Sequence, residues 1–335
     1  MSRYDPILTV VPAGAQVTPA LRRAAQLARA GAGTLHLCIF EYDDAVDFAA
    51  ARAGGAIAGH ARNDLVREQQ EKLGELASGD LLRGLAVQCD VVWAPLAHEA
   101  VIAKALATGA QLVVKDSHRE SLLRRTVFTP LDWKLMRLLP CSTLFVQAGE
   151  HPRPQRIAAA VDVLAEPAQA DGLNARILHE ALGLAECLEA QLEVVSVVPF
   201  LAPHRHTFSP VGRMFEEAEA AHLAAFTEFM DFREVPPECR HRLAGAPAAV
   251  LAEFVANRGI GLLVLGSAYR DAWDRLLLGS TAETLMQEAA VDLMLVKPAG
   301  TLELVQEKFD LAQLCRRHER LQEGLPAFPP RRAQA

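Results

Sequence analysis

The chain has few aromatic residues, no paired cysteines and no long apolar run. Aromatic side chains make up 6% of its 335 residues. No apolar run approaches the roughly 20 residues that cross a bilayer, and the first residues lack the charged and apolar regions of a signal peptide. The six cysteines are scattered without a CxxC pair. This spacing excludes a zinc ribbon and favours free thiols in the reducing cytoplasm over disulfides.

Several catalytic motifs are also missing. The sequence contains no Walker A lysine after a glycine loop, no GxSxG elbow and no SGGxD pyrophosphatase loop, which excludes P-loop enzymes and the usual α/β-hydrolases. No base and metal ligands for efficient phosphoryl transfer are recognisable, so any ATP hydrolysis is expected to be slow. The net charge of −7 argues against nucleic acid or a membrane as partner. We expect a cytoplasmic protein that binds a small molecule and is not assigned as an enzyme.

Short apolar strands alternate with amphipathic helices along the chain. The pattern predicts strands at 7–11, 34–40, 87–93, 111–115 and 143–146, and again at 157–161, 192–198 and 262–265. Residues 42–59 are rich in Ala and Gly and predict a mobile loop or a loose helix. Strands alternating with helices predict an α/β fold whose sheet is mostly parallel, with right-handed crossovers.

The chain contains an internal repeat. A shift of 150 positions places LVVKDSHRE from Leu112 on LLVLGSAYR from Leu262, and PILTVVP on RIAAAVD. A repeat of this length indicates tandem domains. We expect a first domain at 1–150, a second at 151–300, and a C-terminal helix with a disordered tail at 301–335. The helix is predicted to reach about Glu323 and to clasp the second domain through Val305, Phe309 and Ala312.

The stretch from Leu262 to Lys297 is the best candidate for a ligand site. It predicts a buried strand ending at Gly266, a loop, and a helix that begins after Gly279 and Ser280. The first turn of a helix offers free N–H groups to a phosphate, and the carboxyl edge of a parallel sheet is where such ligands bind. The alternative is an ordinary loop with turn glycines.

These residues resemble the universal stress protein family. The family pattern of a strand-end Asp, a Gly-x-Pro turn and G-x2-G-x9-G-[S/T] is matched by Asp162, Gly245 with Pro247, Gly266, and Gly279 with Ser280. The resemblance implies two Rossmann-like domains of the adenine nucleotide alpha hydrolase-like type, each with a five-stranded sheet. It also implies an adenine nucleotide such as ATP, with Mg, in the second domain, at a site lined by Asp162, Val197, Leu265, Gly266, Ser267, Tyr269, Gly279, Ser280 and Thr281.

The first domain resembles the E-type tandem members of that family, through HRESLLRRTVFTPLDWKLMRLLPCS and QCDVVW. It departs from the nucleotide pattern, because Pro12 replaces the strand-end Asp and Asp116 replaces the first glycine. Thr129 and Pro130 stand where the pattern has Gly-Ser. Pro130 removes a helix-start N–H and Asp116 adds negative charge where phosphates would lie. No nucleotide is expected there.

The second domain departs from the pattern at one position, because Tyr269 replaces the second glycine. Tyrosine disfavours the positive φ that glycine allows, and its ring would stack over the pocket or fill it. Arg270 offers a cation to phosphate or is a solvated loop residue. The alternative function is a module whose pocket takes an apolar or lipid-like molecule, or one that acts through protein partners.

Two further expectations concern metal and assembly. His204 and His206 are weak candidates for a zinc site that needs two more ligands, for which His222, Glu216 or Glu217 are available. The alternative is a solvated loop pair. The two domains are expected to form an internal pseudo-dimer, with a homodimer through edge strands as a further option.

Overall fold

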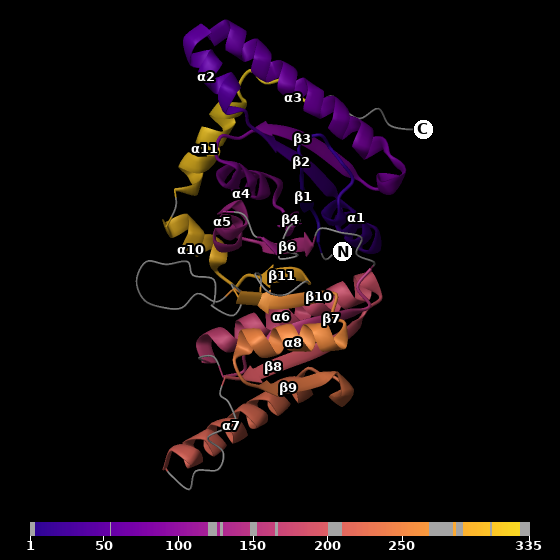
Figure 1. The fold of residues 1–335 in the computed structure, drawn as a ribbon, viewed down its shortest axis with the longest axis vertical. Coiled ribbons are helices and arrows are strands. Elements are labelled where there is room, and N and C mark those ends of the chain that lie inside the picture. The colour runs from indigo at the N-terminus through magenta and orange to yellow at the C-terminus, as the bar shows by residue number, and fades with distance from the viewer. Residues whose placement is uncertain are drawn as a thin grey trace. The chain divides into compact units, whose positions relative to one another are not determined.

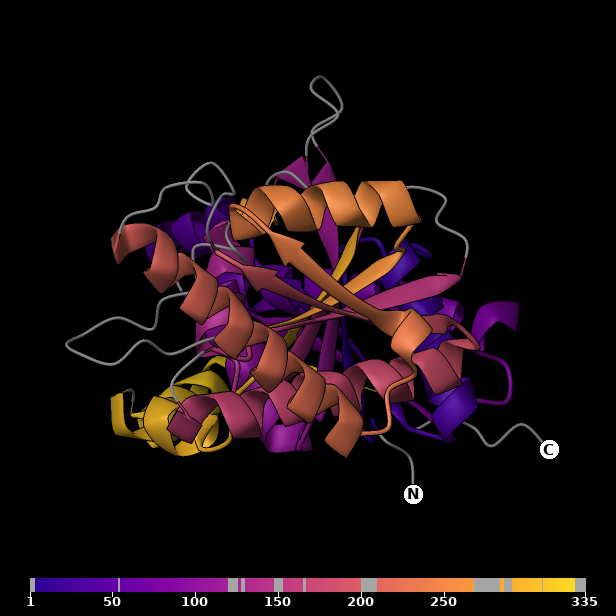
Figure 2. The same cartoon turned by 90° about the horizontal axis from the view of Figure 1, so that it is seen from below.

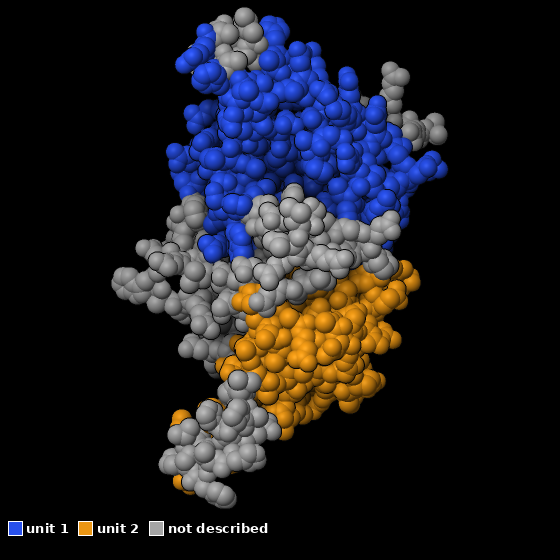
Figure 3. Space-filling model, in the orientation of Figure 1, with its two compact units in different colours: residues 1–116, 130–141, 302–335 blue, residues 117–129, 142–301 orange. Residues whose placement is uncertain are grey.

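A computed structural model describes residues 4–53, 55–119, 126–127, 130–147, 153–164, 167–199, 210–267, 284–285, 291–308 and 310–328. The chain forms two compact units (Figure 3). Unit 1 comprises Met1–Asp116, Pro130–Cys141 and Leu302–Ala335, and unit 2 comprises Ser117–Thr129 and Ser142–Thr301. None of the described helices combines the length and the apolar character needed to cross a membrane.

Unit 1 is built on a parallel sheet. Its strand order is β3 (Val87–Trp93), β2 (Leu35–Glu41), β1 (Ile7–Val11) and β4 (Leu112–Arg119) (Figure 1). The central strands β1 and β2 are buried along most of their length, which is the pattern of a parallel sheet covered by helices on both faces. The helices are α1 (Pro19–Gly31), α2 (Asp44–Ala53), α3 (Gly55–Ser78), α4 (Ala97–Thr108) and α5 (Pro130–Leu138).

The helical alternative predicted for residues 42–59 is confirmed, as α2 and the start of α3. Asp43 precedes α2 and its carboxylate accepts hydrogen bonds from the backbone N–H groups of Ala45 and Val46. A carboxylate in this place satisfies donors that the first turn leaves unpaired. The alanines that follow have the highest helix propensity, so the segment continues as a helix.

Unit 2 contains a sheet with one antiparallel pair. Its strand order is β6 (Ser142–Gln147), β11 (Asp292–Val296), β10 (Leu262–Gly266), β7 (Arg156–Val161), β8 (Gln191–Val198) and β9 (Arg240–Ala244). Only the pairing of β6 with β11 is antiparallel among the pairings described for these six strands. The prediction of five strands in each domain does not match this division. The reason is that β6, which ends the first repeat, belongs to unit 2 and pairs there with β11. The Rossmann-like character of the fold is confirmed.

The helices of unit 2 lie on both faces of the sheet. Figure 2 shows α8 (Pro247–Arg258) on one face and α6 (Pro167–Leu188) with α7 (Pro210–Phe232) on the other. This division follows from the strand order, because β7 to β8 to β9 runs one way across the sheet and β9 to β10 returns past β7.

The structure corrects the expectation for the C-terminal segment. The segment forms two helices, α10 (Thr301–Lys308) and α11 (Leu311–Gln322), and it packs on unit 1 rather than on the second domain. Val305 is buried as predicted, but Ala312 is exposed and Leu311 is buried in its place. The reason is a new helix start, since the Asp310 carboxylate accepts from the backbone N–H of Gln313 and resets the buried face. Phe309 lies outside the described residues.

Candidate nucleotide site

The carboxyl ends of β7 and β10 form the candidate site in unit 2. The strand order reverses between these neighbours, because the chain proceeds from β7 to β8 and β9 and then returns to β10. In a doubly wound sheet a crevice opens at this switch point, and ligands bind there. Val264 is paired with Ala159, so the two strands end at a similar level, at Gly266 and Val161. The sequence-predicted residues Asp162, Gly266 and Ser267 therefore lie at one edge.

Asp162 is held at the end of β7 by a side chain of α6. The Asn174 Oδ1 accepts from the Asp162 backbone N–H at 3.0 Å, and the Asn174 Nδ2 donates to the Asp162 carbonyl at 2.7 Å. The Asp162 carboxylate accepts from the backbone N–H of Leu164 at 3.2 Å and is exposed. Asn174 was not predicted as a site residue. The signal for it is a lone buried Asn on the apolar face of α6, one helical turn before Ile177 and Leu178.

Gly266 allows α6 to approach the end of β10. A Cβ added at this position would lie 2.7 Å from Leu173 Cδ2 and 2.9 Å from Ile177 Cδ1. Both distances are well inside normal carbon contact, which is about 3.5–4.0 Å. A side chain here would have to displace the ends of Leu173 and Ile177, so helix packing favours a glycine whether or not a nucleotide binds, in the way that one glycine of dinucleotide-binding folds permits close helix–strand contact.

The other described site residues lie at or near the carboxyl ends of β8 and β10 and are buried or half-buried. Leu265 is buried and Val197 is half-buried near the end of β8. Ser267 is 5% exposed, and its Oγ has no hydrogen-bond partner within the described part of the chain. The corresponding hydroxyl in the first repeat, Ser117 Oγ, donates to the Val146 carbonyl at 3.1 Å. A buried hydroxyl without a partner is costly, so the Ser267 Oγ is a candidate ligand contact.

Several predicted residues lie outside the described residues. They are Tyr269, Arg270, Gly279, Ser280 and Thr281, which follow β10 in the sequence, and His204 and His206, which precede α7. Where the chain is described, no group of three or more His, Cys, Asp or Glu side chains is placed to hold a metal ion. His222, named above as a further zinc ligand, instead contacts a serine.

His222 and Ser196 form a buried polar pair beside the site. The His222 Nε2 lies 3.0 Å from the Ser196 Oγ, both residues are 1% exposed, and the imidazole stacks on Phe226. Burial lowers the pKa of His222 below 6.5, and Arg242 lowers it further while Asp162 opposes the shift. Its Nδ1 has no partner among the described atoms. A neutral imidazole on α7 therefore contacts β8 at Ser196, the residue before Val197.

The equivalent position in unit 1 is filled by the chain itself. The Asp116 Oδ1 accepts a hydrogen bond of 2.9 Å from the backbone N–H of Ala20, in the first turn of α1. A carboxylate at a helix N-terminus takes the place that an anionic ligand would occupy. Beneath it, the Lys115 ammonium donates to the Asp116 carbonyl at 3.0 Å and pairs with the Asp132 carboxylate at 2.8 Å.

The backbone that follows β4 also differs from a phosphate loop. The end of β4 pairs antiparallel with β5 (Thr126–Val127), with His118 opposite Val127 and Arg119 opposite Thr126. The first repeat thus has a hairpin where the family pattern has its glycine loop. A ladder uses backbone N–H groups that a phosphate-binding loop would leave available.

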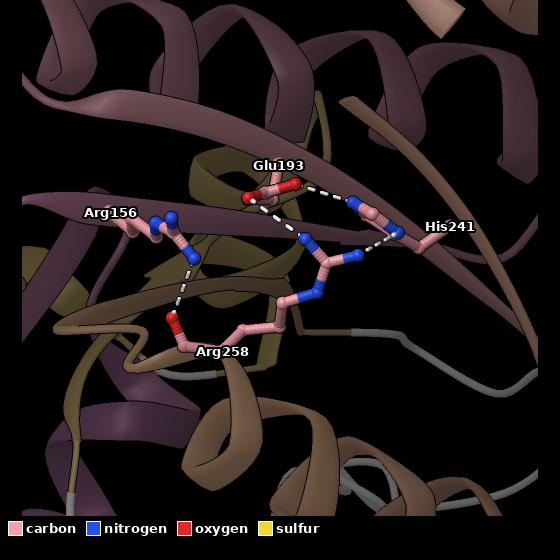
Figure 4. Close-up of polar contacts among 4 residues, drawn as sticks. All are labelled: Arg156, Glu193, His241 and Arg258. Atoms are coloured by element: carbon pink, nitrogen blue, oxygen red, sulfur yellow. Dashed lines mark hydrogen bonds and ion pairs between the residues drawn. The ribbon is translucent and has the colours of Figure 1, made fainter. Parts of the chain in front are cut away.

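An ionic cluster occupies the opposite, amino-terminal edge of the unit 2 sheet (Figure 4). Glu193 of β8 accepts from the His241 Nε2 of β9, and its other oxygen lies 3.7 Å from an Arg258 nitrogen. Arg258 also contacts the His241 Nδ1 at 3.4 Å, and Arg156 donates to the Arg258 carbonyl at 3.1 Å. Since Glu193 is 6% exposed, the contacts of His241 and Arg258 satisfy a buried carboxylate, which is a structural role.

Comparisons with known proteins agree with this architecture. The sequence profile of the universal stress protein family matches residues 3–147 and 155–297. Universal stress protein E of Escherichia coli K12 is 25% identical over 304 residues, which cover 89% of this chain and 95% of that protein. The universal stress protein E homolog of Haemophilus influenzae is 27% identical over 221 residues, 64% of this chain and 71% of that protein.

The solved structures lead to the same family. The crystal structure of a putative universal stress protein from Pseudomonas aeruginosa UCBPP-PA14 superposes with a TM-score of 0.70 at 25% identity, covering 92% of this chain and 98% of that one. A universal stress protein from Archaeoglobus fulgidus has the same fold, with a TM-score of 0.57 at 12% identity over 87% of this chain and 98% of its own. This chain belongs to the universal stress protein family, as a tandem member similar to universal stress protein E over most of its length.

Proposed function

We propose that this protein binds one adenine nucleotide, in the second repeat only, and takes part in a stress response as a ligand-binding protein. The proposal rests on a contrast at equivalent positions. In the first repeat the Asp116 carboxylate bonds to the start of α1, whereas in the second repeat Gly266 stands at that position and the carboxylate of Asp162 is exposed. Among the described residues, the start of α1 in the first repeat is thus bonded to an internal carboxylate at the position where the second repeat has a glycine.

Each described site residue is suited to a different part of a nucleotide. Asp162 offers a carboxylate for a ribose hydroxyl, and Val197 and Leu265 offer apolar contacts for a base. The start of α6 is not next to the end of β7. The residue of α6 that contacts Asp162 is Asn174, seven residues after the helix begins at Pro167, so the free N–H groups of the first turn lie about two turns away. We therefore assign the phosphate donors to residues 268–283. By the family resemblance these donors are the N–H groups and hydroxyls at Gly279 and Ser280, with ATP and Mg as ligands.

The test is equilibrium binding of ATP-Mg to the full chain, together with analysis of nucleotide released from denatured protein. We expect one site for each chain. Asp162→Ala should weaken binding about tenfold or more, since a hydrogen bond to a charged group contributes about 1.5–3 kcal/mol. Gly279→Val should abolish it. Asp116→Asn is the matched control in the first repeat and should leave both affinity and stoichiometry unchanged.

Three results would contradict the proposal. Two nucleotides per chain would show that the first repeat binds as well. Unchanged affinity in Gly279→Val would show that the site is misplaced. No bound nucleotide and no thermal shift in millimolar ATP-Mg would favour the alternative, an apolar ligand or a protein partner. Leu173 and Ile177, which contact the space above Gly266, would be apolar walls for such a ligand.

We further propose that the repeats form an internal pseudo-dimer and that the protein is cytoplasmic. The pseudo-dimer is supported by the antiparallel pairing of β6, the last strand of the first repeat, with β11, the last of the second. A cytoplasmic location is supported by six free cysteines, since thiols persist in reducing compartments.

A further inference from the structure

Asn174 is a buried polar residue on an otherwise apolar face of α6. It is 4% exposed and lies one helical turn before Ile177 and Leu178, which are also buried. A buried amide costs free energy unless both its donor and its acceptor are bonded. Both groups of Asn174 bond to the same residue, since the Oδ1 accepts from the Asp162 N–H and the Nδ2 donates to the Asp162 carbonyl. We call these two hydrogen bonds the Asn174 clamp.

The packing of α6 does not by itself explain an asparagine at this position. Asp162 stands at the exposed end of β7, where water is the usual partner of backbone groups. An apolar side chain at position 174 would pack on the sheet as Ile177 and Leu178 do, without the cost of removing an amide from water. The orientation of Asp162 is therefore the better explanation for the clamp.

The clamp leaves one carboxylate oxygen of Asp162 available to a ligand. The Oδ1 accepts from the backbone N–H of Leu164 at 3.2 Å. The other oxygen has no hydrogen-bond partner within the described part of the chain. Since Asn174 holds the backbone of Asp162 and the Leu164 N–H holds one oxygen, the remaining oxygen is restricted to a narrow range of directions.

One short stretch of α6 contacts both strand ends that form the candidate site. Leu173 and Ile177 lie against Gly266 at the end of β10, and Asn174 bonds to Asp162 at the end of β7. Residues 173–177 of α6 therefore fix the position of Asp162 relative to the end of the neighbouring strand.

The strand end of the first repeat is held differently. Pro12, which stands where the second repeat has Asp162, has no N–H to donate. Its carbonyl accepts from the Ala15 N–H at 3.1 Å, so the strand ends in a local turn, and its side chain has no carboxylate. The clamp thus belongs to the repeat for which we propose a nucleotide.

We propose that Asn174 is the positioning residue of the nucleotide site, and that it sets a preference for a ribose hydroxyl by fixing the Asp162 carboxylate. Asn174 acts through Asp162 and not by contact with the ligand. A carboxylate that is already held in one direction accepts a hydroxyl hydrogen without a further loss of rotational freedom, and this preorganisation adds to affinity. The inference rests on the function proposed above.

The test compares the binding of ATP-Mg and of its 2′-deoxy and 3′-deoxy analogues to the full chain. Asn174→Leu removes the clamp and keeps the size of the side chain and the apolar face of α6. We expect it to weaken ATP about tenfold, as the loss of one hydrogen bond to a charged group would. The analogue that lacks the contacted hydroxyl should lose less, so the preference for ATP falls. In the Asp162→Ala background, Asn174→Leu should change ATP affinity by less than about twofold.

Leu178→Val is the matched control. Leu178 lies on the same buried face of α6, and the variant loosens packing without touching Asp162. It should lower thermal stability and leave the preference for ATP over the deoxy analogues unchanged. A loss in Asn174→Leu that is equal for all three ligands, or equal with and without the Asp162 carboxylate, would show a general structural effect and overturn the inference.

Hydrogen exchange tests the clamp in the chain without ligand. In Asn174→Leu the Asp162 amide should exchange about tenfold or more faster relative to the Ser267 amide, whose acceptor is the Val296 carbonyl of β11. Unchanged exchange of the Asp162 amide would overturn the inference. If the unchanged chain binds no nucleotide, the proposed function fails and the preference fails with it. Nucleotide binding that Asn174→Leu does not weaken would overturn this inference alone.

Discussion

The replacement of Gly266 by alanine gives the sharpest test of how the candidate site is built. The new methyl group would lie 2.7 Å from Leu173 Cδ2, 3.0 Å from Leu173 Cγ and 2.9 Å from Ile177 Cδ1. Normal contact starts near 3.5 Å, so these atoms must retreat by about 0.8 Å. Overpacking of this kind costs about 1–3 kcal/mol of unfolding free energy. We expect Gly266→Ala to destabilise unit 2 by that amount.

A double-mutant cycle identifies the cause. Leu173 is half-buried, so Leu173→Ala alone should cost about 1–2 kcal/mol, less than for a fully buried leucine. In the Leu173→Ala background the added methyl group has room. Gly266→Ala should then be neutral or slightly stabilising, because it reduces the freedom of the unfolded chain. The coupling between the two sites should be about 1–3 kcal/mol.

The assay is urea denaturation followed by circular dichroism, with hydrogen exchange of the β10 amides as a local measure for unit 2. Gly172→Ala is the control in the same helix, since a Cβ there has nothing within 4 Å, and it should stabilise by about 1 kcal/mol. If Gly266→Ala is harmless, or equally harmful with and without Leu173, then helix packing is not the reason for this glycine.

Two further predictions concern buried charges. Lys115→Met should destabilise unit 1 by about 3–5 kcal/mol, because it leaves the fully buried Asp132 carboxylate without its cation. The double variant Lys115→Met/Asp132→Leu should recover much of this loss in thermal denaturation, and no recovery would contradict a role for the ion pair. Burial keeps the pKa of His222 below 6.5 in the folded chain, so the unfolded chain takes up the proton first as pH falls. The unfolding free energy should thus fall below pH 6.5 and be independent of this group above it. His222→Gln should reduce that slope, and an unchanged slope in this variant would contradict the assignment.

The sequence was informative about elements and weaker about how they pair. Short apolar runs predicted β1 and β7, an apolar run bounded by Gly266 predicted β10, and the match of the chain with itself at a shift of 150 positions was enough to indicate tandem domains. The pairing of β6 with β11 was not accessible, because strand partners depend on tertiary contacts and not on local pattern. The C-terminal helix was placed on the wrong domain for a similar reason. Its apolar residues show that it packs on something, but nothing in them distinguishes one core from the other.

For the candidate site, too, single residues were predictable from the sequence and their contacts were not. The sequence alone identified Asp162 and Gly266 as strand-end residues, and it recognised Asp116 as an anion at the wrong place for a nucleotide, because charge and side-chain size are properties of single residues. Tertiary structure alone showed that Gly266 faces Leu173 and Ile177 of α6, that Asn174 holds Asp162, and that the Asp116 carboxylate bonds to Ala20. These are contacts between residues far apart in the chain, and only the packing of helices on the sheet brings them together.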